Sequence, residues 1–249
     1  MNLGKRGWGR RHWLPFVNRR PVRLGNVGPV VTFTFDDFPR TAYTVGGKIL
    51  RDFDTRGTFY AAFGLMNSTN SSGDQFCLDD LHSLVADRHE LASHTFHHVS
   101  SHTTSACGFL QEVREGCAAL QQIPGLTISN NFAYPLGAVT VRTKREVGKE
   151  MLSCRGNYHG VNGPVVDASL LRANPLYGDT DQLDFVRRLV RDNEKSTGWL
   201  IFYTHDVRKS PSPYGCTPTL LESAIKVVLD SSMKILTVDE ILSRVDARL

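Results

Sequence analysis

The 249-residue sequence lacks any apolar run as long as a membrane-spanning helix requires. Its main uncharged apolar stretch, Trp199 to Tyr203, is far shorter than the roughly 20 residues needed to cross a bilayer. Nothing between Met1 and Pro29 forms the apolar segment of roughly 7 to 15 residues that a secretory signal peptide contains. We therefore expect no transmembrane helix, no signal peptide and a cytoplasmic location.

Cysteine is scarce and follows no metal-binding or disulfide pattern. The five cysteines are odd in number, include no C-x-x-C pair, and stand at Cys77, Cys107, Cys117, Cys154 and Cys216. This pattern argues against a disulfide framework and against a structural zinc knuckle. Reduced thiols with structural roles are the default expectation, in agreement with the expected location.

Acidic residues are absent from the first 25 residues, which carry a charge of about +7, whereas the remainder sums to −3. We interpret residues 1–29 as a basic arm and residues 30–249 as one domain. The default expectation is that the arm is solvated or loosely docked. An anionic membrane surface or an acidic glycan is the alternative partner, and no nucleic acid is expected. Trp8, Trp13 and Phe16 could pack on the domain or on a ligand.

After the arm, apolar runs of strand length alternate with segments of helical period. The strand candidates are residues 30–35, 57–63, 90–93, 131–134, 170–174, 199–204 and 234–238. The helix candidates are residues 45–54, 78–88, 105–122, 141–149, 181–195, 218–230 and 238–249. Apolar strands separated by helices indicate an α/β fold with a parallel sheet covered on both faces. About seven strands favour closure into a barrel, and no low-complexity linker divides the chain.

Two adjacent carboxylates, Asp36 and Asp37, stand at the carboxyl end of the first strand candidate. In parallel α/β folds the catalytic groups gather at this end of the strands because the loops there converge. Side chains alternate along a strand, so the two carboxylates should point apart and do different jobs. Taken alone, the pair is equally well explained as a turn or a helix cap.

Histidines follow two further strand candidates. The strand over 90–93 leads into the sequence H-T-F-H-H, in which a helical turn would place His94 and His98 on one face, a spacing that suits two imidazoles on one metal ion. The strand over 199–204 leads into His205 and Asp206, which alone could be a capping pair. Three such clusters, all expected at the carboxyl ends of the strands, favour a functional site.

One carboxylate and two imidazoles leave coordination positions open on a zinc-like cation, as a catalytic metal site requires. The second carboxylate and the third histidine would then remain as base and acid. This is the equipment for metal-assisted hydrolysis of an amide or ester. A non-haem iron oxygenase uses the same ligand types, but the alternation of strands and helices disfavours it.

The motifs T-F-D-D, H-T-F-H-H, F-A-Y-P-L-G at 132–137 and a strand ending in H-D resemble, in order and spacing, those of the polysaccharide deacetylase (NodB-homology) family, carbohydrate esterase family four. The resemblance covers residues 30–245. It implies a distorted (β/α) barrel and a metal-dependent hydrolase. The enzyme would remove acetyl groups from N-acetylated sugars of a poly- or oligosaccharide or of a biosynthetic glycan intermediate. It also implies one divalent metal ion, with zinc expected first and other first-row metals as alternatives.

The resemblance also implies a role for each clustered residue. Asp36 would be the general base and His205 the general acid, and the metal ligands would be Asp37, His94 and His98. The remaining histidine of the second motif, at position 97, receives no role.

The third motif would form one wall of the substrate groove, through Tyr134, Pro135 and Leu136, with the backbone N–H of Leu136 aimed at the oxyanion. The motif departs from the family pattern, because Ala133 and Leu136 replace the usual arginine and tyrosine. Phe38 likewise replaces the glycine that usually follows Asp-Asp. The F-A-Y-P-x-G form resembles a variant branch, and a backbone donor survives replacement of its side chain. A catalytically silent glycan-binding or scaffolding protein with a retained metal site is the alternative.

The missing third-motif arginine normally fixes the base carboxylate, so a substitute is needed. We predict that Arg172 supplies it, because a guanidinium in an otherwise apolar strand is costly to bury without a partner. The alternative is that Arg172 points outward to solvent.

Overall fold

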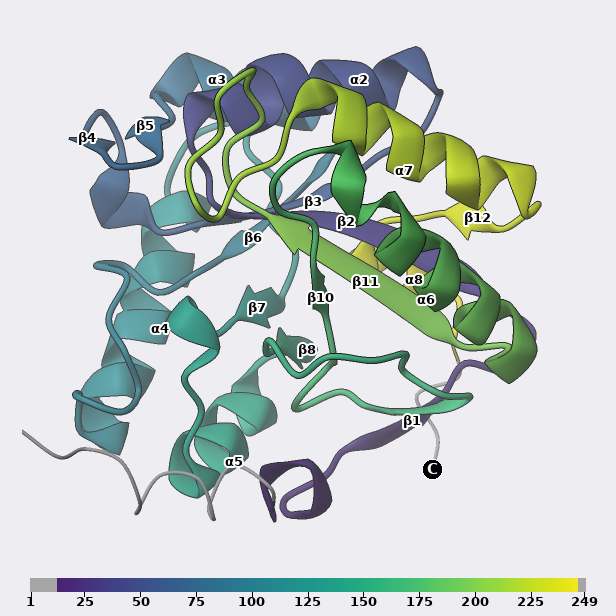
Figure 1. Cartoon of the computed structure of the whole chain (residues 1–249). Helices are drawn as coiled ribbons and strands as arrows, with labels where there is room; N and C mark the ends of the chain where they lie inside the picture. The colour runs from purple at the N-terminus through teal and green to yellow at the C-terminus, as the bar shows by residue number, and fades with distance from the viewer. Residues whose placement is uncertain (1–12, 246–249) are drawn as a thin grey trace, which may run out of the picture.

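The computed structural model describes residues 13–245, and its centre is an eight-stranded parallel sheet. The strands of this sheet are β2 (Val30–Asp37), β3 (Thr58–Ala61), β6 (Glu90–Ser93), β7 (Asn131–Ala133), β8 (Ser153–Arg155), β10 (Asn174–Pro175), β11 (Trp199–Thr204) and β12 (Lys234–Ile235). Seven of them follow the order β10-β11-β2-β3-β6-β7-β8, and β12 pairs with β2. The sheet curls into a distorted half-barrel, which confirms the predicted fold class (Figure 1).

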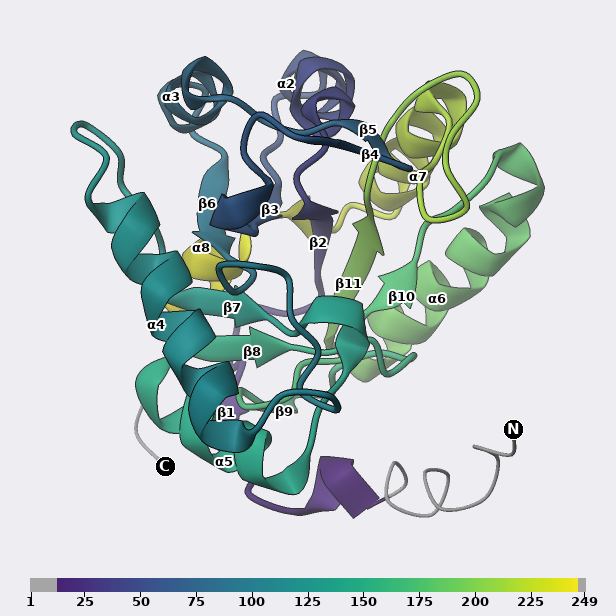
Figure 2. The ribbon, with the colours of Figure 1, turned by 90° about the vertical axis from the view of Figure 1, so that its left-hand side faces the viewer.

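Helices surround the strands, as Figures 1 and 2 show. They are α2 (Lys48–Asp52), α3 (Leu78–Ala86), α4 (Ala106–Gln121), α5 (Val141–Glu150), α6 (Leu183–Ser196), α7 (Pro218–Asp230) and α8 (Val238–Leu242). A π-helical turn, η2 (Ala42–Gly47), precedes α2, and the short 3-10 turns are η1 (Leu14–Phe16), η3 (Phe63–Leu65), η4 (Pro135–Gly137) and η5 (Thr180–Gln182). Hydroxyl oxygens of Ser105, Thr140, Thr217 and Thr237 accept backbone hydrogen bonds at the starts of α4, α5, α7 and α8, which fixes where these helices begin.

The core is built on β2 and β11, which pair in register over six residues, from Trp199 opposite Val30 to Thr204 opposite Phe35. Phe33 and Phe35 pack against the helices on one face of the sheet. The alternating Thr32 and Thr34 are also buried, and each hydroxyl donates to a backbone carbonyl. Neighbouring side chains of a strand point to opposite faces, so burial of all four residues means that both faces of the central strands are covered. The two hydroxyls cost little free energy to bury because they are hydrogen-bonded.

The segment at 168–175 completes the curve of the sheet, but not as the regular strand predicted for 170–174. Leu171 donates its N–H to the Cys154 carbonyl at 2.8 Å, whereas only Asn174 and Pro175, as β10, pair with β11. The first half of the segment therefore lies on β8 and the second half on β11. The bend between them is the physical reason that no continuous strand forms. Strand β8 itself was not predicted.

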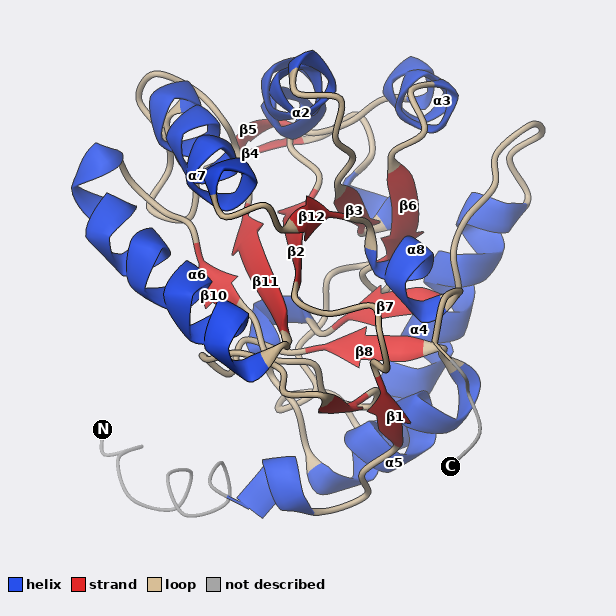
Figure 3. Ribbon diagram, turned by 90° about the vertical axis from the view of Figure 1, so that its right-hand side faces the viewer, coloured by secondary structure: helices blue, strands red, loops and turns tan. Residues whose placement is uncertain are grey.

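The amino ends of the strands are covered by α8, which Figure 3 shows in front of the sheet. The N–H of Val238 donates to the Thr58 hydroxyl at 3.1 Å, and the N–H of Asp239 donates to the Glu90 carboxylate at 3.0 Å. A two-stranded ribbon, β4 (Thr69–Asn70) and β5 (Gly73–Asp74), lies at the opposite end (Figure 2). Within residues 13–245, no helix is both long and apolar enough to span a bilayer.

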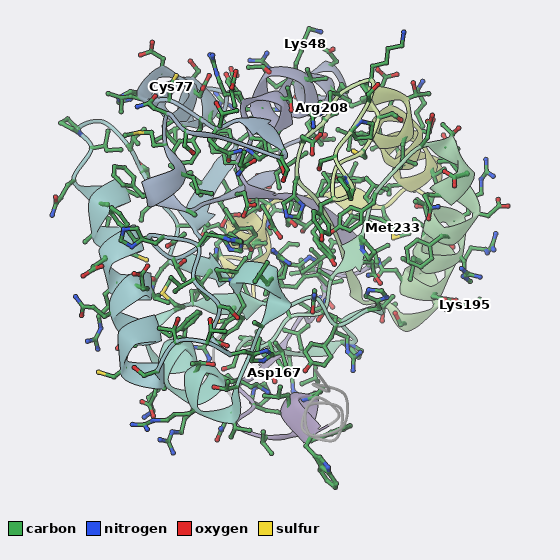
Figure 4. All side chains as sticks on the ribbon, turned by 60° about the vertical axis from the view of Figure 1, so that its left-hand side comes forward. Lys48, Cys77, Asp167, Lys195, Arg208 and Met233 are labelled. Atoms are coloured by element: carbon green, nitrogen blue, oxygen red, sulfur yellow. The ribbon has the colours of Figure 1, made fainter. Side chains whose placement is uncertain are left out.

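The described part of the basic arm is docked on the domain. Strand β1 (Pro21–Arg23) pairs antiparallel with β9 (Val165–Asp167), whose last residue, Asp167, lies opposite Pro21 and is labelled in Figure 4. The buried Lys144 ammonium donates to the Leu14 and Val17 carbonyls, both at 2.7 Å, and forms an ion pair with Asp167 at 2.7 Å. Residues 1–12, which include Trp8, lie outside the described residues.

Candidate active site

The end of β2 directs its two carboxylates to different partners. Asp37 has a left-handed backbone, with φ of 63°, so the extended strand ends at this residue. The Asp37 Oδ1 atom lies 3.0 Å from His98 Nε2 and 3.4 Å from His94 Nε2, whereas Asp36 Oδ1 lies 2.5 Å from the Arg155 guanidinium. As predicted, the two carboxylates point apart: Asp37 faces the histidines, and Asp36 faces an arginine.

The two histidines of the second motif meet Asp37 from an irregular loop and not from the helical turn that their spacing suggested. Thr95 and His98 both have left-handed backbones, with φ of 65° and 55°. His97 turns away, because its ring and its backbone N–H both contact the Glu112 carboxylate at 2.9 Å. Left-handed residues outside glycine are strained and concentrate at functional sites, so this loop is held in shape by its surroundings.

The cluster of Asp37, His94 and His98 fits a metal ion. One possible ligand atom from each residue lies within 4.8 Å of the others. Asp37 Oδ1 is buried and, among the described residues, lacks a hydrogen bond of good geometry. His94 Nδ1 lies 2.8 Å from the Ala133 carbonyl, so it carries the proton and leaves Nε2 as an acceptor facing Asp37. A second partner that fixes the tautomer in this way is typical of metal-ligating histidines.

The pKa values of the three cluster residues are shifted in different directions. Burial lowers the pKa of His94 to about 4, so its imidazole is neutral at neutral pH. Burial would raise the pKa of Asp37, but contact with His98 and the nearby His205 and His94 hold that pKa below its usual range. Burial would likewise lower the pKa of His98, and contact with Asp37 raises it above the ordinary histidine value. An ionised carboxylate therefore lies beside one neutral imidazole, and a bound cation would take the place of the proton that Asp37 favours on His98.

Arg155, and not Arg172, is paired with Asp36. Arg155 is the last residue of β8 and is 1% exposed. Arg172 instead donates to the His159 carbonyl at 2.9 Å and lines a hollow of about 150 Å³ together with Phe16. The prediction for Arg172 is wrong because a local carbonyl satisfies its guanidinium, away from Asp36.

The third motif contributes fewer side chains to the surface than predicted. The Tyr134 side chain is buried between Phe109 and Phe132, with ring centroids 6.1 and 5.1 Å away, and Pro135 is buried as well. The side chains of Tyr134 and Pro135 therefore face the core, and substrate binding by this segment stays a prediction for its backbone and for Leu136. Leu136 is 69% exposed and has a left-handed backbone, with φ of 59° and ψ of 10°. It remains the candidate oxyanion donor through its N–H.

His205 lies on a loop that is tied to the end of β11. Its Nδ1 and its backbone N–H each lie 3.1 Å from the Tyr214 carbonyl, which assigns the ring proton to Nδ1. The next residue, Asp206, is fully buried, accepts from the Ser212 backbone N–H at 2.9 Å, and pairs with Arg208 at 2.7 Å (Arg208 is labelled in Figure 4). Asp206 therefore holds the loop that presents His205.

A family model and several solved structures match the chain. The family model described as polysaccharide deacetylase matches residues 25–152. No curated protein sequence matches the chain at the significance required.

Several solved structures share its fold. The chitin deacetylase of Colletotrichum lindemuthianum has 20% sequence identity and a TM-score of 0.60, covering 90% of this chain and 94% of the other. A family 4 acetyl xylan esterase from Clostridium thermocellum, in complex with a cobalt ion, has 17% identity and a TM-score of 0.56, covering 86% and 90%. A mutant of BA3943, described as a family pseudoenzyme with restored activity, has 14% identity and a TM-score of 0.56, covering 86% and 68%.

Proposed function

Because the chain belongs to the polysaccharide deacetylase family, we propose that it is a metal-dependent N-deacetylase of acetylated carbohydrates. The observation that carries the proposal is the meeting of Asp37, His94 and His98 beside Asp36. The carboxylate of Asp36 is buried and held by a guanidinium, so a base and a ligand set occupy one strand end. This combination suits hydrolysis of an amide.

Asp37, His94 and His98 would hold a divalent cation, for which zinc is our first proposal. When bound, such a cation polarises an amide carbonyl and makes water more acidic. Two imidazole nitrogens and one carboxylate leave coordination positions open, as catalytic sites require. The cobalt ion in the related acetyl xylan esterase supports a divalent metal.

The other residues would move the protons. Asp36 accepts a proton as water attacks the acetamide carbonyl. The Leu136 N–H would donate to the developing oxyanion, and one such donor contributes on the order of 3 kcal/mol. His205 then donates a proton to the departing sugar nitrogen, because an amide anion is too poor a leaving group. Acetate and a free sugar amine are the products.

The substrate class follows from the family, and we propose an N-acetylated poly- or oligosaccharide or a biosynthetic glycan intermediate. We also propose residues 30–249 as the catalytic domain, with the third motif in the F-A-Y-P-x-G variant form. The five cysteines carry free thiols, which is consistent with the cytoplasmic location that we propose. We further propose peripheral contact of the basic arm with an anionic membrane surface.

Metal content and acetate release test the proposed function together. Purified protein should bind about one equivalent of zinc or cobalt and release acetate from members of a panel of N-acetylated sugars. The triple variant Asp37→Ala, His94→Ala, His98→Ala should lose both properties. Asp36→Asn should keep its metal and lose roughly 10²- to 10⁴-fold in rate. His97→Ala, in the same motif but turned toward Glu112, is the matched control and should retain both.

The outcomes separate the two functions considered. Stoichiometric metal in the triple variant would refute the ligand assignment. Near-normal turnover by Asp36→Asn would exclude Asp36 as the general base. Metal binding without acetate release from any sugar in the panel would instead favour the catalytically silent glycan-binding or scaffolding protein.

A further inference from the structure

Arg155 reaches the interior of the barrel from β8 and meets Asp36 from β2. The guanidinium Nη2 lies 2.5 Å from Asp36 Oδ1, and Nη1 donates to the Gly156 carbonyl at 2.9 Å. Both side chains are buried, at 1% and 7% exposure. A buried carboxylate in a charge-assisted hydrogen bond with a fixed donor has little freedom to rotate.

Two aromatic rings hold the guanidinium from different strands. The Arg155 Cζ atom lies 5.2 Å from the centroid of Tyr60, on β3, and 5.1 Å from that of Tyr203, on β11. Guanidinium groups stack on aromatic faces, and such contacts fix the plane of the group. The donor is therefore positioned by packing before it contacts Asp36.

The neighbouring strand explains why the arginine comes from β8. Ala133, where the family usually has the third-motif arginine, is the direct partner of Arg155 in the pairing of β7 with β8. Ala133 is fully buried against Tyr60 and Ala92. Adjacent strands lie about 4.8 Å apart, so a long side chain at either position can approach the same carboxylate. A small residue at 133 leaves that space to the guanidinium from 155.

We infer that Arg155 is the positioning residue for Asp36, and that the guanidinium required in this family has been transposed from position 133 to its neighbour across β7 and β8. The inference rests on the proposed function, in which Asp36 is the base. It assigns Arg155 to orientation of the carboxylate and not to contact with substrate. It also supplies, from the adjacent strand, a guanidinium for the role of the missing third-motif arginine.

Variants at the two positions test the inference. Arg155→Met should lower kcat by roughly 10- to 1,000-fold, change KM by less than about threefold, and leave metal content unchanged, because a misplaced base affects the chemical step. The double variant Ala133→Arg, Arg155→Ala should have a kcat at least about tenfold above that of Arg155→Ala. Arg155→Lys keeps a charge without the planar fork and should be intermediate. Arg172→Met is the matched control and should keep the native rate.

Several results would overturn the inference. They are native kcat in folded, metal-bound Arg155→Met, a rise in KM alone, or no gain in the double variant relative to folded Arg155→Ala. If Arg155→Ala and Arg155→Met fail to fold, folding and turnover of the double variant support the transposition, and an inactive folded double variant refutes it. If the native protein releases no acetate, the proposed function fails separately. Crystal structures then decide the positioning role, which requires Asp36 to rotate in Arg155→Met and to return in the double variant.

Discussion

Phe38 occupies a backbone conformation that glycine adopts without strain. Its φ is 69°, in the left-handed region, yet its side chain is fully buried. The ring packs against Phe59 and Phe76 at centroid distances of 5.3 and 5.1 Å. A left-handed conformation costs a non-glycine residue roughly 1 kcal/mol, and burial of a phenylalanine contributes more than that. Packing therefore offsets the strain where the family usually has glycine.

This balance predicts that at position 38 glycine is less destabilising than alanine, the reverse of the usual order. Both Phe38→Ala and Phe38→Gly should destabilise by about 3–5 kcal/mol, because each leaves a cavity. Phe38→Gly should nevertheless be about 1 kcal/mol more stable than Phe38→Ala, since glycine relieves the strain. Urea unfolding of metal-free protein measures the difference.

Phe76 supplies the matched control. It is equally buried, and its backbone φ is negative. Phe76→Gly should therefore be less stable than Phe76→Ala by about 0.5–1 kcal/mol. The same order of glycine and alanine at both positions would show that strain at Phe38 contributes nothing.

The site residues differ in how far the sequence predicts them. The sequence predicts that Asp36, Asp37, His94 and His98 lie close together, because their two motifs stand at the carboxyl ends of predicted parallel strands. Arg155 was missed, since its strand has only three residues and reads as part of a loop. Arg172 was chosen from an apolar context, but sequence cannot show that the His159 carbonyl already satisfies its guanidinium.

At the scale of elements, regular segments were predicted with good bounds and irregular ones were not. Strands β6 and β11 and helix α7 have the bounds expected, because apolar runs and a proline at the helix start define them. The segment at 170–174 divides its hydrogen bonds between β8 and β11, and a hydrophobic pattern carries no information about such a bend. The loop from His94 to His98 similarly depends on tertiary contacts rather than on helical spacing.

Helix α5 anchors the N-terminal segment through Lys144. This ammonium is fully buried and satisfies two carbonyls and the Asp167 carboxylate. Arg20 adds hydrogen bonds to the carbonyls of Gly148, Met151 and Leu152, at the end of the same helix. A cation near a helix C-terminus is favourable, and this applies to Arg20. Lys144, in the first half of α5, holds the segment through its ion pair and its two carbonyl contacts.

Removal of Lys144 should therefore weaken the attachment of the N-terminal segment to α5 and lower the stability of the fold. Lys144→Met leaves Asp167 without its buried cation and should lower the free energy of unfolding by about 3–5 kcal/mol. Lys149→Met, on the same helix, removes only an exposed pair with Glu146 and should change it by less than about 1 kcal/mol. Denaturant unfolding measures both variants. Equal effects would mean that Lys144 does not anchor the segment.

For the whole molecule, the charge is divided unevenly along the chain. About +7 lies in the first 25 residues and −3 in the remainder. The docked part of the basic segment exposes Trp13 and Phe16, at 70% and 72%. Asn18 donates to the Val141 carbonyl and joins this segment to α5, on which Arg142 and Arg145 are exposed. Aromatic rings among basic groups suit the interface of an anionic bilayer.

The full chain should therefore bind vesicles of phosphatidylserine and phosphatidylcholine, and not vesicles of phosphatidylcholine alone. Each basic residue near an anionic surface contributes about 1 kcal/mol at low salt. The screening length falls from about 10 Å at 0.1 M salt to about 3 Å at 1 M, so high salt should release the protein. The double variant Trp13→Ala, Phe16→Ala should bind more weakly in co-sedimentation. Tyr214→Ala, which alters an aromatic side chain that is 56% exposed on the loop after β11, is the control and should bind normally. Equal binding to both kinds of vesicle, or binding that persists in 1 M salt, would exclude an electrostatic membrane contact and leave the basic segment as a docked element of the fold.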